Sequence, residues 1–262
     1  MLTTILILVA VTIFYIVIHR LSKSIFILKH TFKIISLAFA VFIIAIIIGA
    51  FYVVSDANNF RTHFFNSTNL FLLENNSKFI TGVEISANSK NQYNTLSTDK
   101  LTSLEKEYKN DNINGLREGY YKVFVINIVA LDGIKSFKMT DQNINIDLEQ
   151  AKKILLSNTP KDDLAIIEST QNNLSSQTIK NSISISDEQL KGYVFSYYIT
   201  NILNPENFQN LVNDLKDNKI HIYENTALFK ALKLIPAFIM NDLMSKDYIS
   251  SAANSTLNLM NS

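Results

Sequence analysis

The chain has 262 residues, with 24 Lys and Arg against 23 Asp and Glu, which gives a net charge of +1. It contains no cysteine, and this excludes disulfides, thiolate metal sites and cysteine nucleophiles. Every acidic residue lies after residue 55, whereas four basic residues precede it. The remaining chain therefore carries a small negative excess, which argues against a nucleic-acid partner because such binding needs a basic face.

Two apolar runs open the chain, Leu2–Ile18 and Ile34–Val54. The second run has no charge, and its 21 residues match the roughly 20 needed to cross the hydrocarbon core. The first run is shorter, and its alternative interpretation is a secretory signal peptide. Because no charge precedes it and it ends in His19 and Arg20, a retained helix is favoured. The two runs predict a transmembrane helical hairpin over residues 1–55.

The charge pattern predicts the orientation of this hairpin. Residues 55–66 hold a single basic residue, Arg61. Cytoplasmic loops are enriched in Lys and Arg, which predicts a multi-pass protein of the cell membrane with both termini outside the cytoplasm. The opposite orientation is the alternative. The predicted topology residues between the two runs are Arg20, Lys23, Lys29 and Lys33.

Residues 56–262 contain no Pro/Gly/Ser-rich linker and are predicted to form one extracytoplasmic domain. In its first half we expect an antiparallel sheet. Leu70–Glu74 and Lys78–Ser86 flank turn-forming Asn residues and predict a β-hairpin. Thr98–Tyr108 has apolar residues at helical spacing. Gly119–Leu131 predicts a central buried strand, and Ser136–Ile146 keeps a two-residue alternation.

The second half has a helical period. Asp147 with Gln150, and Ser186 with Gln189, have the spacing of capping boxes at the start of helices, the second running through Leu203. Further helices are predicted from Thr159 and Pro160 through Glu168, over Glu206–Leu215, and over Ala227–Met244 with a kink at Pro236. Residues 169–186 predict an exposed loop or weak strand, and Ile220–Tyr223 a short strand. The predicted class is α+β.

Motifs for catalysis or metal binding are sparse. Beyond residue 56 the only histidines are His63 and His221, and no His-Glu-x-x-His pattern, Gly-x-Ser-x-Gly elbow or Gly-rich phosphate loop occurs. We therefore expect no metal and no cofactor, and we interpret His221 as a residue on the solvent face of a strand. Asp141, Asp162 and Asp163 are the candidate carboxylates for an enzyme. Helix-dipole complementarity is an alternative explanation for Asp162 and Asp163, which open a helix.

Aromatic side chains are the candidate binding residues. Tyr193, Tyr197 and Tyr198 crowd one predicted helix together with Phe195, and Phe238 lies off the apolar stripe of the last helix. One interpretation is an aromatic surface for a partner. The other is a centrally buried helix. For the last helix, the alternatives are burial in the core and packing on the membrane surface or on a partner.

The sequence resembles a family of uncharacterised two-span membrane proteins of small-genome archaea. The residues that carry the resemblance are the N-terminal hairpin, NLFLLENNSKFITGVEIS at Asn69–Ser86, and YYKVFVINIVALDG before the Asp147 helix. The resemblance implies the architecture and no activity. Anchorage without catalytic motifs predicts a binding or assembly subunit at the cell envelope, in contact with the lipid bilayer and with a protein partner or a second copy. The alternative is a membrane-anchored, hydrolase-type envelope enzyme that uses carboxylates or hydroxyls.

Overall fold

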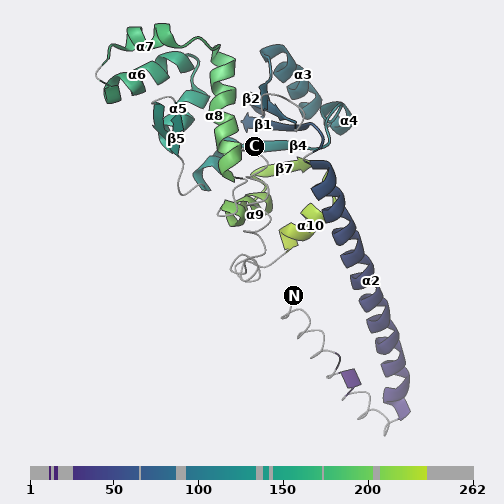
Figure 1. Ribbon diagram of the computed structural model, residues 1–262. Helices are drawn as coiled ribbons and strands as arrows, with labels where there is room; N and C mark the ends of the chain where they lie inside the picture. The colour runs from purple at the N-terminus through teal and green to yellow at the C-terminus, as the bar shows by residue number, and fades with distance from the viewer. Residues whose placement is uncertain are drawn as a thin grey trace. The chain divides into compact units, whose positions relative to one another are not determined.

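The structure, a computed structural model, describes residues 12, 15–16, 26–64, 66–86, 93–133, 138–141, 144–172, 174–202 and 207–234. Two compact units make up the chain, Met1–Ser55 and Asp56–Ser262. The predicted α+β class is confirmed, since the second unit combines helices with a five-stranded sheet (Figure 1).

The long helix α2 spans Phe26–Phe64. It begins before the predicted span Ile34–Val54 and continues beyond it. The extension has a simple cause, because residues 55–64 contain neither Pro nor Gly to stop a helix. Lys29 and Lys33, which were predicted to lie in a loop, are therefore helical residues. Most of the first apolar run, together with Arg20 and Lys23, lies outside the described residues.

The five-stranded sheet has the order β3-β2-β1-β4-β7. The predicted hairpin is confirmed as β1 (Asn69–Asn75) and β2 (Lys78–Ile85). Its two turn residues, Asn76 and Ser77, both have positive φ, which matches the right-handed twist of paired strands. β3 (Tyr93–Thr95) adds an antiparallel edge.

The prediction of a purely antiparallel sheet is wrong. β4 (Val123–Asn127) pairs with β1 in parallel, and β7 (Ile220–Tyr223), which was predicted as a strand, then pairs antiparallel with β4. Parallel neighbours need a crossover connection, and the segment that carries α3 (Thr98–Lys109) and α4 (Ile113–Leu116) supplies it. β4 also ends earlier than predicted, because the 3₁₀ helix η2 (Ile128–Gly133) follows it.

A separate two-stranded sheet contains the alternating segment, with β5 (Lys138–Asp141) paired to β6 (Ile144–Asp147). The Asp147 capping box is confirmed at the start of α5 (Leu148–Leu156). The reciprocal Ser186 and Gln189 hydrogen bonds precede α8 (Asp187–Ile202). α6 spans Pro160–Asn172, α9 Phe208–Lys216 and α10 Ala227–Leu234.

The predicted loop or weak strand over 169–186 is wrong. α6 continues to Asn172, and α7 occupies Ser176–Ser182. The Ser175 hydroxyl accepts a hydrogen bond from the Thr178 amide at 3.1 Å, and Ile179 is buried. The cap stabilises the start of this short polar helix, and Ile179 and the ion pair between Lys180 and Asp162 hold it against its neighbours.

Two hydrophobic clusters lie on opposite faces of the sheet, and Figure 1 shows α8 on one side and α3 with α4 on the other. On the α8 face, alternate residues such as Phe71 and Phe124 pack against α8 and α5. On the α3 face, Leu70, Leu72 and Val125 pack against α3 and α4.

Candidate membrane anchor and polar clusters

The most distinctive feature of the first unit is the apolar surface of α2. Residues Leu37–Phe64 have a mean hydropathy of 2.9 in their most apolar window, and none of that window is buried. Phe51 and Leu37 are about 70 % exposed, at 71 % and 68 %. Among the described residues this is the one helix long and apolar enough to cross a membrane. A core helix of the same composition has its apolar side chains covered, and this one does not.

A contact between two described residues links the two apolar runs. The rings of Tyr15 and Phe39 stack with centroids 5.4 Å apart and an interplanar angle of 13°. Tyr15 belongs to the first run and Phe39 to the second.

The last turns of α2 belong to the second unit and pack on its α8 face. The Phe60 ring lies 4.7 Å from that of Phe64 and meets the Phe229 ring edge-on at 5.3 Å. Phe64 in turn meets Phe124 of β4 edge-on. The missed signal in the sequence is the spacing of Phe60 and Phe64, which puts both rings on one side of a helix.

Asp56 makes the polar counterpart of this packing. Its Oδ2 accepts a hydrogen bond from the Leu228 amide at 2.7 Å, which satisfies one of the free N–H groups at the start of α10. A carboxylate at that position is also favoured by the helix dipole. Asp56 is therefore a helix cap that comes from a distant part of the chain.

Lys122, just before β4, forms the buried centre of a charged cluster. It is 3 % exposed, and its Nζ donates to the Glu224 carbonyl at 3.3 Å and lies 5.1 Å from the centre of the Tyr121 ring. Burial lowers the pKa of Lys122, while the nearby carboxylates of Glu224 and Asp56 act in the opposite direction.

Arg117 completes this cluster through an ion pair between its Nη2 and Glu224 Oε2 at 3.3 Å. Two cations thus face the two carboxylates of Asp56 and Glu224. Lys122 is the buried member of this group, so removing a carboxylate that compensates it leaves a buried charge, which costs more than an intact pair contributes. The arrangement is suited to holding the end of α2, the sheet and α10 together.

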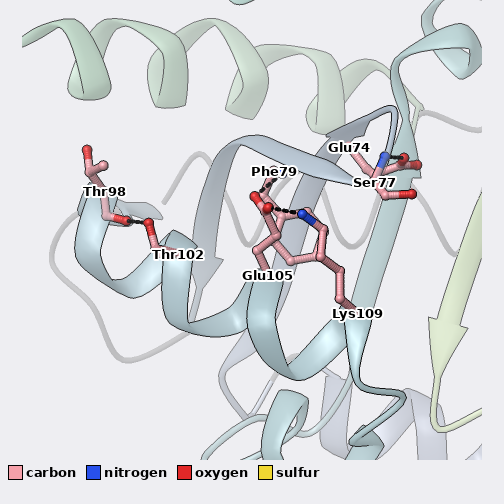
Figure 2. A network of polar contacts seen from close by, with 7 residues as sticks. All are labelled: Glu74, Ser77, Phe79, Thr98, Thr102, Glu105 and Lys109. Carbon is pink, nitrogen blue, oxygen red and sulfur yellow. Dashed lines mark hydrogen bonds and ion pairs between the residues drawn. The ribbon is translucent and has the colours of Figure 1, made fainter.

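A second polar cluster lies on the α3 face at the end of β1. Figure 2 shows Glu74 beside Ser77, whose amide donates to Glu74 Oε1 at 2.5 Å. Asn127 of β4 donates to Glu74 Oε2 at 3.0 Å. Glu74 is 8 % exposed, and its two donors tie the β1–β2 turn to the end of β4. The same view shows Glu105 of α3, which accepts from the Phe79 amide and pairs with Lys109.

His221 lies in β7 on the same α3 face, since Ile220 and Ile222 on either side of it point into the opposite cluster. Burial, followed by the charge of Lys233, lowers the pKa of His221, and Glu74 acts against them. The prediction of a solvent-facing strand residue missed this partial burial. Nearby, the Tyr108 hydroxyl is hydrogen-bonded to Tyr223, and burial raises the pKa of Tyr108 to about 12.

The candidate carboxylates do not converge. Asp162 pairs with Lys180, whereas Asp163 pairs with Lys153 at 2.9 Å. The Lys153 and Ser157 hydrogen bonds lower the pKa of Asp163. Asp162, Ser176 and Lys180 line a pocket of about 200 Å³ between α6 and α7. Asp141 lies in β5, and its side chain is outside the described part of the structure.

The aromatic candidates of α8 split into two groups. Tyr198 is fully buried and stacks on Phe195, so its ring belongs to the core and is not available to a partner in this structure. Tyr193 and Tyr197 are half-buried against the same cluster. The interpretation of a centrally buried helix therefore accounts for α8. Phe238 lies outside the described residues.

No described group of three or more His, Asp or Glu side chains is arranged to hold a metal ion. Comparison with protein-family models, with curated proteins and with solved structures finds no match. Function is therefore inferred from the chemistry of the molecule itself.

Proposed function

We propose that this protein anchors an α+β domain at the outer face of a cell membrane, where the domain works by binding, as a subunit or assembly factor of the envelope. The observation that carries the proposal is the long, exposed apolar surface of α2. The charged residue Asp56 marks the end of this apolar part of the helix. Water disfavours such a surface by about 25 cal/mol for each Å² of exposed apolar area, and a bilayer removes that cost.

The proposed anchor has two spans, Leu2–Ile18 and the apolar part of α2. The stacking of Tyr15 on Phe39 supports neighbouring spans. The four basic residues before the second span, against Arg61 alone just after it, support an orientation with both termini and the domain outside.

The absence of cysteine allows a direct test of topology. Single cysteines are introduced at Lys100, which is exposed in α3, and at Lys23 between the two apolar runs. A membrane-impermeant maleimide should label Lys100→Cys in intact cells and Lys23→Cys only after permeabilisation. The reverse pattern would place the domain in the cytoplasm, and labelling of both in intact cells would rule out the two-span anchor.

Exposed apolar side chains support binding as the role of the domain. Leu156, Ile166 and Leu174 are about half exposed and lie on the segment from α5 to α7. Apolar groups in water favour contact with a partner protein or a second copy. The full chain, solubilised from its native membrane in mild detergent, should form a particle larger than one copy. Ile166→Asp should reduce that particle to a monomer, whereas Val129→Asp, on η2, should leave it intact.

A hydrolase-type enzyme is the second candidate, because Asp162 and the Ser176 hydroxyl line the same pocket. It predicts a hydrolytic activity of the purified full chain that is lost in Asp162→Asn and kept in Asp163→Asn. A chain that is monomeric in mild detergent and has such an activity would favour this candidate over binding.

A further inference from the structure

The helix α10 combines features that point to a lipid surface. Its sequence ALFKALKL contains no acid. Phe229 is buried against Phe60, and Leu232 packs partly on the core. One turn apart on another side of the helix lie Lys230, which is exposed, and Leu234, which is 81 % exposed. Leu234 has the largest exposed fraction of the large apolar side chains that the structure describes.

The short chain distance between α10 and the apolar run of α2 suggests what covers the side of α10 that carries Lys230 and Leu234. Asp56, which caps α10, follows the uncharged run of α2 by two residues, or about 3 Å of helix. Phe60, which contacts Phe229, follows it by about 9 Å. The headgroup layer on one side of a bilayer is roughly 5 to 8 Å thick. If the uncharged run spans the membrane, the start of α10 is tethered through Asp56 within two residues of chain, at most about 7 Å, of the end of that run.

The chemistry of the exposed side fits the headgroup layer. A lysine and a leucine one helical turn apart suit an interfacial helix, in which the ammonium reaches the phosphates and the leucine enters the acyl boundary. The sequence after Leu234 continues with the apolar residues Ile235 to Met240, interrupted only by Pro236. Glu224, whose side chain is partly exposed, is paired with Arg117 and does not oppose anionic headgroups as a free charge.

We propose that α10 lies on the membrane surface through Lys230 and Leu234, with anionic lipid headgroups as its partner. This inference rests on the proposed membrane anchor and adds a second attachment of the domain to the bilayer. The docked helix restricts the domain, because its N-terminus is tied to Asp56 and its exposed side to the lipid.

The absence of tryptophan makes the test direct. Leu234→Trp is prepared as the only tryptophan of the full chain and reconstituted in vesicles of phosphatidylcholine with one quarter phosphatidylglycerol. Part of the lipid carries bromine either near the headgroup or near the chain end. Leu234→Trp should lose most of its emission to the shallow bromines and less to the deep ones. Adding Lys230→Glu to the Leu234→Trp variant should reduce the quenching by the bromines near the headgroup.

Two control variants separate this inference from the anchor. Phe42→Trp, on the apolar surface of α2, should be quenched most by the deep bromines. Leu174→Trp, exposed at 56 % on the domain, should not be quenched by either. Quenching of Phe42→Trp without quenching of Leu234→Trp would overturn the docking of α10 and leave the anchor standing. Blue-shifted emission from Leu234→Trp that no bromine quenches would assign the surface to a protein partner. An unquenched Phe42→Trp would overturn the anchor itself.

Discussion

The two faces of the central sheet are closed in different ways. On the α8 face, helix backbone approaches the sheet closely, because a Cβ added at Gly192 would lie 2.8 Å from Thr95 Cβ. On the α3 face, a Cβ added at Gly82 would meet only the tips of leucines, with Leu72 Cδ2 and Leu96 Cδ1 both at 2.8 Å. The α3 face also holds the Glu74 cluster and His221. The difference teaches that α8 depends on a close fit to the sheet at Gly192, whereas the space around Gly82 on the α3 face is filled by leucine side chains that can adjust.

The sharpest test of this difference is to add a methyl group at one glycine on each face of the sheet. Gly192→Ala forces α8 away from the β-branched Thr95, and we expect a loss of about 3 kcal/mol in the free energy of unfolding. Gly82→Ala can be accommodated by leucine rotation and should cost about 1 kcal/mol. Guanidinium unfolding of the full chain in detergent measures both. Thr95→Ala should recover part of the Gly192→Ala loss, and equal losses for the two glycine variants would contradict the distinction.

The next effect concerns the end of α2, where Phe60 and Phe64 pack on the α8 face. Asp56→Ala removes the cap of α10 and one of the two carboxylates near Lys122. We expect a loss of about 2 kcal/mol. Asp56→Asn keeps an acceptor for the Leu228 amide and should lose less. Hydrogen exchange at the Leu228 amide should accelerate in Asp56→Ala. Unchanged exchange there would show that α10 does not depend on this cap.

Much of the fold was predictable because its signals are local. The Asn-rich turn, the pairs Asp147–Gln150 and Ser186–Gln189, and the strand Ile220–Tyr223 each lie within a few residues, and all are present. The parallel pairing of β1 with β4 was not predictable from period, because it depends on the direction in which the chain returns after α3. The contact between Asp56 and Leu228 joins residues far apart in sequence, and a capping residue with no helix beside it gives no local signal.

The candidate sites were harder to predict for the same reason. An acidic pair at a helix start is compatible with catalysis and with ion pairing, and only the positions of Lys153 and Lys180 show that Asp162 and Asp163 have separate partners. A tyrosine-rich helix is likewise compatible with a partner surface and with a core. The burial of Tyr198 depends on the sheet beneath it, which no pattern within α8 specifies.

A smaller effect is expected when one tyrosine hydroxyl is removed from each face of the sheet. The Tyr198 hydroxyl is buried on the α8 face without a hydrogen-bond partner among the described residues, whereas the Tyr108 hydroxyl on the α3 face is bonded to Tyr223. Tyr108→Phe should lose about 1 kcal/mol, and Tyr198→Phe should be neutral or gain up to about 1 kcal/mol. The same unfolding measurement checks both. A clear loss of unfolding free energy in Tyr198→Phe would show that this hydroxyl has a hydrogen-bond partner, such as a buried water, on the α8 face.

The smallest expected effect is a pH dependence confined to the α3 face. Burial and Lys233 hold the pKa of His221 below its usual value of about 6.5, so the folded protein favours the neutral imidazole more than the unfolded chain does. Its contribution to stability is complete above that pH and is lost as the pH falls below it, because the unfolded chain then binds the proton first. The stability of the protein relative to His221→Asn should therefore decline from pH 7 to pH 5. The atoms nearest to Gly192 belong to Thr95, which does not titrate, so Gly192→Ala should shift stability equally at both pH values. A stability difference between the protein and His221→Asn that stays constant or grows on acidification would mean that Glu74, which favours the charged ring, outweighs burial at this position.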